Sequence, residues 1–546
     1  MLQSNNSRKM KSRRTGLGWL AISAAAVVLI ALLLVARTSF SVPVENKAPA
    51  SPPAAAQSQK VSKNASNRSD DLALGREIDR AIDESELTQA RWGVSVMSLN
   101  DGRVVYSRDA GKLFTPASNM KVYTTAVALD LLGAEYRWRT SVYAAKDPDN
   151  DGVIDGDLIL YGRGAPDFVS SGKDGLAGLA DQLYQRGVRR VRGDIVGDES
   201  YLRGEPYGDG WQWTDLQWYF GAAPSALTID ANAFELTVTP GARRGSAASL
   251  EIKRQTDYVH LRNNMTTVER GSFSTIGINR GLSDNNVVVW GEFPEGGRGF
   301  TAYLSIYNPA LWAADRFKES LTSHGVRVDG ETRSRDFRVA ANEILDPSQA
   351  VELAQIESKT LGEIVRATNK ESINLNAELI LRTLGKERGL LAPEPDPRRM
   401  KQRGDDQAGV AVIKMWLERA GITTTGVAIR DGSGLSRLNL VSPESTVRLL
   451  LAIARTNSYQ VFRDSLPVAG RDGTLAGRLR GTTGRVVAKT GTLTYDHSLS
   501  GYATTQNGEV YAFSIFCNDA VGRSDPVKVI DRIAGTLASV PVPGRP

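Results

Sequence analysis

The stretch FTPASNMKVYTTAVALDLLG, residues 114–133, sets a serine and a lysine three positions apart at the start of an otherwise apolar helix. Thr115 is suited to cap this helix, and Pro116 fits its first turn. Because the residues that follow are almost all apolar, the sequence predicts a buried helix. Ser118 and Lys121 would share one face of it at the edge of a core, with Cβ atoms roughly 5–6 Å apart.

A serine hydroxyl is a poor nucleophile until a base takes its proton. The chain has three histidines and neither a G-x-S-x-G nor an H-E-x-x-H motif, so Lys121 is the candidate base. A free lysine, with a pKa of about 10.4, is protonated at neutral pH. It could act as a base where burial or a second cation lowers its proton affinity. The sequence therefore needs another cation and proton-relaying groups near Ser118.

A second stretch, NKESINLNAELILRTLG, could supply polar groups. Ser372 and Asn374 stand two positions apart, directly before an apolar helix. In a short turn, such a pair can point its side chains into one cleft. Taken alone, the same pair is also typical of ordinary helix capping.

A third stretch, RVVAKTGTL, could supply the second cation. Lys489, Thr490 and Gly491 end a β-branched run that is typical of a strand. On an edge strand Lys489 and Gly491 face one way, and the glycine lets a substrate backbone lie close. The N–H groups of Thr492 and Ser118 could then donate to an oxyanion. Taken alone, the tripeptide also fits an exposed strand lysine followed by a turn.

Together the three motifs, in this order, resemble the set found in class A β-lactamases and penicillin-binding proteins. More closely, the chain resembles the D-Ala-D-Ala carboxypeptidase/endopeptidase family of class C low-molecular-mass penicillin-binding proteins, peptidase family S13. The stretches GRGAPDF, DGSGLSRLNLVSP and LPVAGRDGTLAGRL also follow the family's order, and the resemblance covers about residues 75–540. Ile373 departs from the Asp or Asn that is more usual at the centre of the second motif.

The resemblance implies an α+β, transpeptidase-like fold: an antiparallel five-stranded sheet with helices on both sides, and a large, mostly β insertion. It also implies acyl transfer on peptidoglycan stem peptides without a metal or organic cofactor, with β-lactams acylating the same serine. The implied catalytic residues are Ser118 as nucleophile, Lys121 as base, Ser372 and Lys489 as a proton relay, and Asn374 as a substrate-amide contact. Thr490 and Lys489 would bind the substrate carboxylate, beside Gly491 and Thr492.

The strand patterns place the two ends of the chain in one sheet. RWGVSVMSLNDGRVVYSRD is typical of a hairpin, and strands and a final helix-like segment recur after residue 485. We therefore assign residues 71–135 and 331–546 to the catalytic domain. Residues 136–330, rich in Gly, Tyr and Trp, form an insertion of one or more domains.

The N-terminus predicts an uncleaved signal anchor in the membrane, which its length and the absence of a convincing cleavage site favour over a cleaved signal peptide. Residues 1–15 are basic, residues 16–36 are uncharged and about 31 Å long as a helix, and residues 37–70 have the composition of a disordered linker. The positive-inside rule puts the remainder on the extracytoplasmic, periplasmic side. The net charge of +6 comes largely from the basic tail, so nucleic-acid binding is not expected.

The sequence offers little for metals or disulfides. There is one cysteine, Cys517, which excludes an intrachain disulfide. DPDNDGVIDGDL sets four acidic side chains at calcium-loop spacing but lacks the final bidentate acid, so a solvated turn is the favoured interpretation. These weak calcium candidates are Asp147, Asp149, Asp151 and Asp155.

Two other functions remain open from the residues. A serine β-lactamase or esterase of the same fold would need a water activator for fast deacylation, and no further acid in the sequence can be assigned to that task. A non-catalytic cell-wall-binding protein would use the aromatic insertion to hold glycan. The balance between carboxypeptidase and endopeptidase action also stays open.

Overall fold

The computed structural model describes residues 68–539, apart from residues 255, 342 and 523, and all of them belong to one compact unit. The predicted anchor, residues 16–36, lies outside the described residues. Within the described part of the chain, no helix combines the length and the apolar character that a membrane crossing requires.

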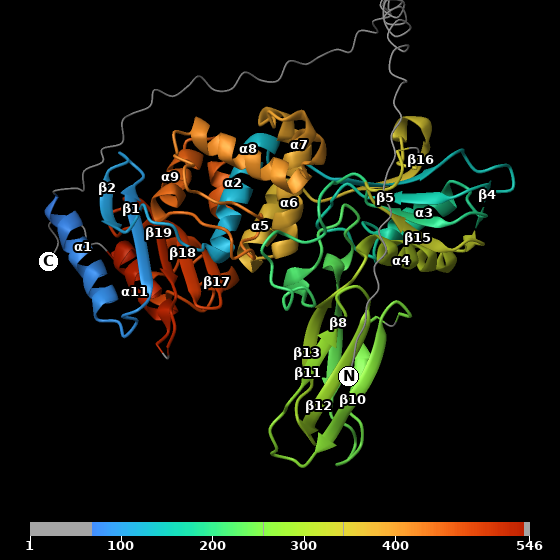
Figure 1. Ribbon diagram of the computed structural model, residues 1–546, viewed down its shortest axis with the longest axis horizontal. Helices are drawn as coiled ribbons and strands as arrows, with labels where there is room; N and C mark the ends of the chain where they lie inside the picture. Colours follow the sequence, from blue (N-terminus) through green and yellow to red (C-terminus); the bar gives the residue numbers. More distant parts are fainter. Residues whose placement is uncertain (1–67, 255, 342, 523, 540–546) are drawn as a thin grey trace, which may run out of the picture. The chain divides into compact units, whose positions relative to one another are not determined.

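One five-stranded antiparallel sheet joins the two ends of the described chain, as the sequence predicts. Its strands are β1 (Arg91–Ser98), β2 (Val104–Arg108), β17 (Val486–Leu493), β18 (Asp496–Thr504) and β19 (Val510–Asn518). They pair in the order β17-β18-β19-β1-β2, so that β17 forms one edge. In Figure 1 the blue strands from the start of the chain therefore lie beside the red strands from its end.

Helices cover both faces of this sheet. The helices α1 (Ser69–Asp83) and α11 (Pro526–Ser539) share a core with Val486 and Ala488 of β17, whereas α2 (Met120–Leu132) and α9 (Pro443–Ile453) share a core with Val487. Because side chains alternate along a strand, Lys489 points to the same side as Val487 and faces α2. The predicted α+β fold is confirmed.

α2 lies at the centre of a helical layer and is almost entirely buried. It contacts α5, α6, α8, α9 and α10, and α6 packs along α8 (Figure 1). The further helices of this layer are α5 (Leu361–Glu371), α6 (Asn374–Arg388), α7 (Pro397–Gln402), α8 (Asp405–Arg419) and α10 (Tyr459–Ser465).

The start of α2 differs from the sequence prediction. Regular helix begins at Met120, and residues Ala117–Asn119 form a 3-10 turn ahead of it. Thr115 does not cap the helix, since the 3-10 turn separates it from α2, and its backbone N–H and C=O both bond the side chain of Asn518 at the end of β19. Ser118 therefore lies in a turn that is tied to the sheet.

The inserted segment first builds an α/β region. Its five-stranded sheet has the order β15-β7-β5-β3-β16, and the β5–β7 and β7–β15 pairs are parallel. Since β15 and β16 belong to it, the sheet continues beyond the boundary predicted at residue 330. The elements of this region are β3 (Arg139–Ala144), β5 (Leu158–Tyr161), α3 (Leu176–Gln185), β7 (Ile195–Asp198), α4 (Pro309–Ser323), β15 (Thr332–Arg335) and β16 (Val351–Glu357), with a small sheet of β4 (Val153–Ile154), β6 (Arg190–Val191) and β14 (Arg327–Val328).

Two three-stranded sheets complete the inserted segment (Figure 1). One comprises β8 (Ala233–Thr239), β9 (Ser249–Ile252) and β13 (Phe300–Ser305), and the other β10 (His260–Val268), β11 (Gly277–Arg280) and β12 (Asn286–Pro294). With these six strands and those of the α/β region, the inserted segment has the mostly β character that the sequence predicts.

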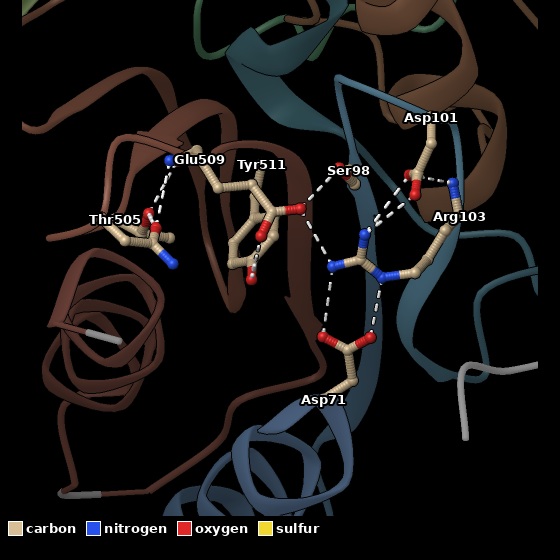
Figure 2. A network of polar contacts seen from close by, with 8 residues as sticks. Asp71, Ser98, Asp101, Arg103, Thr505, Glu509 and Tyr511 are labelled. Atoms are coloured by element: carbon tan, nitrogen blue, oxygen red, sulfur yellow. Dashed lines mark hydrogen bonds and ion pairs between the residues drawn. The ribbon is translucent and has the colours of Figure 1, made fainter. Parts of the chain in front are cut away.

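An ionic cluster joins α1 to the far edge of the central sheet (Figure 2). Arg103 contacts Asp71 of α1 at 2.8 Å, Glu509 at 2.9 Å and Asp101 at 3.1 Å. Burial alone would lower the pKa of Arg103, but the hydrogen bonds and charges of Asp71 and Glu509 outweigh it, and the pKa rises. This cluster, Asp71–Arg103–Glu509, connects the first described helix to β2 and β19.

Candidate active site

Lys121 is the centre of the site. The side chain is fully buried, and its Nζ lies 3.0 Å from Ser118 Oγ, 2.6 Å from Asn374 Oδ1 and 2.8 Å from the carbonyl oxygen of Ser433. The spacing of Ser118 and Lys121 across the turn that precedes α2 brings the first pair together. The structure thus unites the first motif with Asn374 of the second.

The surroundings of Lys121 favour the neutral amine. Burial lowers the pKa of Lys121 to about 7, although the charges of Asp431 and Glu378 oppose this shift. Two of its contacts, an amide oxygen and a carbonyl oxygen, can only accept hydrogen bonds. A neutral amine can donate one N–H to each and turn its lone pair toward Ser118 Oγ. This is the geometry that a general base needs.

The second motif lies at the junction of two helices. Ser372 ends α5 in the left-handed conformation, with φ 60°, and Asn374 is the first residue of α6. The sharp turn lets Ser372 and Asn374 reach the site while Ile373 packs against an apolar cluster that includes Leu375. The Asn374 amide also donates to the carbonyl oxygen of Phe220, at 2.9 Å.

The third motif lies on the edge strand β17. Lys489 is fully buried, and its Nζ donates to Ser372 Oγ and to the carbonyl oxygen of Thr490, each at 2.9 Å. Burial lowers the pKa of Lys489, and the nearby charge of Lys121 lowers it further. The Thr490 hydroxyl bonds that of Thr474 at 2.7 Å. Lys489 thus lies close to Lys121, where the sequence predicts a second basic side chain.

Gly491 lies against the turn that carries the serine. A Cβ atom added to it would come within 2.3 Å of Ser498 Oγ, 2.7 Å of the Pro116 carbonyl oxygen and 3.0 Å of the Ser118 backbone nitrogen. No side chain fits in this space, which explains the glycine. The end of β17, with Thr492, thus approaches the Ser118 N–H, where two backbone donors could face an oxyanion.

The sequence analysis assigned no role to the loop whose Ser433 carbonyl oxygen accepts a hydrogen bond from Lys121. The Ser433 carbonyl belongs to the stretch DGSGLS, residues 431–436, and the backbone N–H groups of Gly432 and Ser433 donate to Glu378 at 3.1 and 2.8 Å. Glu378 is buried on α6, one helical turn after Asn374. Burial raises the pKa of Glu378, and the charge of Asp431 adds to this rise.

Asp431 shapes the same loop. Its carboxylate accepts from the backbone N–H groups of Gly434 and Ser436, from the Asn439 amide at 2.7 Å and from the Trp211 indole at 2.9 Å. The sequence contained a feature that pointed to each of these carboxylates. Glu378 is an acid within an apolar helix, and Asp431 begins a turn with two glycines. Neither feature identifies the partners of the carboxylate, because those partners lie far away in the sequence.

The weak calcium candidates lie apart from this site, in the turn before β4. Asp147 pairs with Arg186, Asp155 pairs with Arg192, and Asp149 accepts the N–H groups of Asp151 and Val153. Within residues 68–539, as far as they are described, no group of three or more His, Cys, Asp or Glu side chains is placed to hold a metal ion. The ion pairs and turn hydrogen bonds of these side chains fit the solvated turn that the sequence analysis favours.

The Ser118 hydroxyl lies beside the buried amine of Lys121, and the amine of Lys489 contacts Ser372. Such an arrangement can carry out acyl transfer through a serine without an imidazole. Together with the helix-flanked antiparallel sheet, this chemistry places the protein among the serine hydrolases that share the β-lactamase and penicillin-binding-protein fold.

Comparison with known proteins narrows the class. The model of the D-Ala-D-Ala carboxypeptidase 3 (S13) family matches residues 74–540. A D-alanyl-D-alanine carboxypeptidase of Actinomadura sp. (strain R39) is 35% identical over 478 residues, which cover 85% of this chain and 84% of that protein. The chain belongs to the D-Ala-D-Ala carboxypeptidase 3 (S13) family and is a serine-type carboxypeptidase, as the resemblance of its sequence predicted.

Further relatives agree with this family. The D-alanyl-D-alanine carboxypeptidase DacB of Haemophilus influenzae is 26% identical over 447 residues, covering 80% of this chain and 88% of that protein. The crystal structure of penicillin binding protein 4 (dacB) from the same organism matches the fold with a TM-score of 0.72, at 23% identity, and covers 86% of this chain and 98% of that one.

Proposed function

We propose that Ser118 is the nucleophile and that Lys121 is the base that takes its proton. Ser118 Oγ attacks the carbonyl carbon of a D-Ala-linked bond, and the proton moves to Lys121 Nζ. The observation that carries this assignment is the set of contacts around Lys121, in which two obligatory acceptors leave one direction for a lone pair, toward Ser118 Oγ at 3.0 Å.

The leaving amine needs a proton, and Ser372 can deliver one. Its hydroxyl lies 2.9 Å from Lys489 Nζ, so that a proton given to the amine is replaced from this lysine. Asn374 contacts the substrate amide. The N–H groups of Ser118 and Thr492 stabilise the oxyanion, and water then hydrolyses the acyl-enzyme.

Substrate binding relies on the edge position of β17. β17 is an edge strand, so an extended peptide can pair with its open edge beside Gly491. Its terminal carboxylate meets Thr490 and Lys489, where a charge-assisted hydrogen bond fixes the end of the chain. This fits a substrate that ends in a free D-alanine carboxylate.

The stem peptides of peptidoglycan, which offer such an end, are the substrates, and β-lactams are covalent inhibitors. A β-lactam complex of the Haemophilus influenzae penicillin binding protein 4 supports the second assignment by likeness of fold. The enzyme works on the extracytoplasmic side of the membrane, held there by residues 16–36. Deleting residues 1–36 and comparing membrane and soluble fractions tests the anchor.

The test of the nucleophile is mass spectrometry of the penicillin-treated protein. A single adduct on the peptide that contains Ser118 is expected, absent from Ser118→Ala, while Ser445→Ala, which removes another buried hydroxyl, retains it. An adduct on another residue would falsify the assignment. The lifetime of the label separates two functions: a stable label supports the peptidase, and rapid release supports a β-lactamase.

A further inference from the structure

A cavity of about 320 Å³ lies in the described residues outside the three motifs. Its walls are the segment that follows β7, the end of β15, the start of α4, residues 223–226 and one side chain of α6. The volume is within the range of small-molecule sites. The crevice beyond the carboxyl ends of parallel strands, here β7 and β15, is also where α/β regions commonly bind ligands.

One wall of the cavity carries a buried cation without an ion-pair partner. The Arg382 side chain is 3% exposed. Its Nη2 donates to the carbonyl oxygen of Glu205 at 2.6 Å, and its Nε has no hydrogen-bond partner. It forms no ion pair with any described carboxylate. The charges of Glu199, Glu378 and Asp405 act on it without contact, so the guanidinium can still bind an anion directly.

Another wall carries a carboxyl group that also lacks an ion pair. Glu199 directly follows β7 and lines the cavity. Burial raises the pKa of Glu199 to about 7; the hydrogen bond with Ser225 and the charges of Arg338 and Arg382 offset only part of this rise, and the charge of Asp336 adds to it. The other charged residues of the lining are paired, Arg335 with Asp198 and Arg338 with Asp336, so Glu199 and Arg382 are the acid and the base of the cavity that have no ion pair.

The start of α4 adds to the positive side. Asn308 caps this 15-residue helix and lines the cavity together with Pro309. The first turn of a helix carries a partial positive charge that favours an anionic group nearby. A ligand carboxylate would therefore find both this helix end and the guanidinium of Arg382.

We propose that this cavity binds a small zwitterion, an amino acid or a dipeptide, with its carboxylate at Arg382 and its ammonium group at Glu199. A simple anion would leave Glu199 without a partner, and a simple cation would leave Arg382 without one. D-Alanine, which a D-Ala-D-Ala carboxypeptidase releases, belongs to this class of ligand. The proposal goes beyond the catalytic roles and depends on none of them. Arg382 shares α6 with Asn374, so the ligand would sit on a helix that reaches the active site.

The test titrates the full chain with D-alanine by calorimetry, with the Ser118→Ala variant in parallel to separate this cavity from the active site. Saturable, one-to-one binding of D-alanine that survives in Ser118→Ala is expected. Acetate and methylammonium, which carry one charge each, should bind at least roughly tenfold more weakly. Absence of D-alanine binding, or equal binding of acetate, would overturn the proposal.

Two variants locate the site. Glu199→Gln keeps the size of the side chain and should weaken D-alanine binding by roughly tenfold or more, and Arg382→Gln should do the same. Glu251→Gln, at an exposed carboxylate of β9 in the same inserted segment, should leave binding unchanged. Thermal melting checks that each variant is folded. Should Arg382→Gln not fold, Glu199→Gln decides alone, and unchanged binding in it contradicts the proposal.

Discussion

Two regions of the catalytic domain each bury a basic side chain, and the pKa values of these two side chains shift in opposite directions. Arg103, 15% exposed, is surrounded by the carboxylates of Asp71, Asp101 and Glu509, and its pKa rises (Figure 2). Lys121, fully buried, touches a hydroxyl, an amide oxygen and a carbonyl oxygen, and its pKa falls to about 7. Burial lowers the pKa of both groups, and the contacting carboxylates reverse this shift at Arg103, whereas Lys121 contacts no carboxylate among the described residues and the more distant charges of Asp431 and Glu378 do not reverse it.

Lys489 extends the comparison. It is buried as completely as Lys121, its Nζ contacts a hydroxyl and a carbonyl oxygen, and a second lysine lies close enough to lower its pKa further. Counter-ions in the Asp71–Arg103–Glu509 cluster keep Arg103 charged, whereas the two lysines, which contact no carboxylate among the described residues, have lowered pKa values. This difference can be tested by removing each basic group in turn.

Lys121→Met should have the largest effect. The change removes the amine but keeps the length of the side chain, so the rate of acylation by penicillin should fall about 10²–10⁴-fold. The melting temperature should change little, because an apolar side chain of similar length fills the space of an amine that forms no ion pair with a described carboxylate. Stopped-flow labelling and thermal melting measure the two quantities. Labelling at the wild-type rate would rule out Lys121 as the base.

Arg103→Met should lower the stability of the protein and leave its acylation rate unchanged. Removing this guanidinium leaves Asp71 and Glu509 without their counter-ion, so the free energy of unfolding should drop by about 3–5 kcal/mol. The acylation rate of the folded protein should not change. Denaturant unfolding measures the loss. Arg80→Met, at the exposed pair with Glu77, is the control and should alter stability by less than about 0.5 kcal/mol.

The pH dependence of acylation should follow Lys121. The protonated amine cannot accept a proton, so the rate should rise with pH, roughly tenfold per unit, and level off above about 7. The Asp71–Arg103–Glu509 cluster should show no such change, because a raised arginine pKa keeps the cation charged throughout this range. Rates of labelling measured from about pH 5 to pH 9 test this. A rise in rate centred near the usual lysine pKa, about 10.4, would contradict the interpretation that Lys121 acts as a neutral amine.

Glu378→Gln should have the smallest effect. The charge of Glu378 opposes the drop in the pKa of Lys121, so its removal should move the acid limb to lower pH, by less than about one unit. The shift is small because the pKa of Glu378 is itself raised. Looser support for the Ser433 carbonyl should also slow acylation at the plateau by up to about tenfold.

The control for Glu378→Gln is Glu357→Gln, at an exposed carboxylate at the end of β16. It should leave both the plateau and the acid limb in place. Equal profiles for the two variants would mean that Glu378 is a packing residue only. Melting curves then show whether its loss acts on stability instead.

Much of the fold could be predicted because its signals are local. Alternating strands with an Asn100–Gly102 turn gave β1 and β2, and the pattern after residue 485 gave β17 to β19. The prediction failed where a distant partner competes with a local one. Thr115 has the chemistry of a helix cap, but the side chain of Asn518 takes its backbone groups, and regular helix begins only at Met120.

The sequence by itself determined the three motifs, their order and the scarcity of histidine, and these made Lys121 the candidate base. Spacing along one turn links Ser118 to Lys121, so that part of the site is local. Only the tertiary structure decided which groups surround Lys121, among them the Ser433 carbonyl and Asn374. Burial lowers the pKa of Lys121 against the opposing charges of Asp431 and Glu378, and burial against residues hundreds of positions away is a property of the folded chain alone.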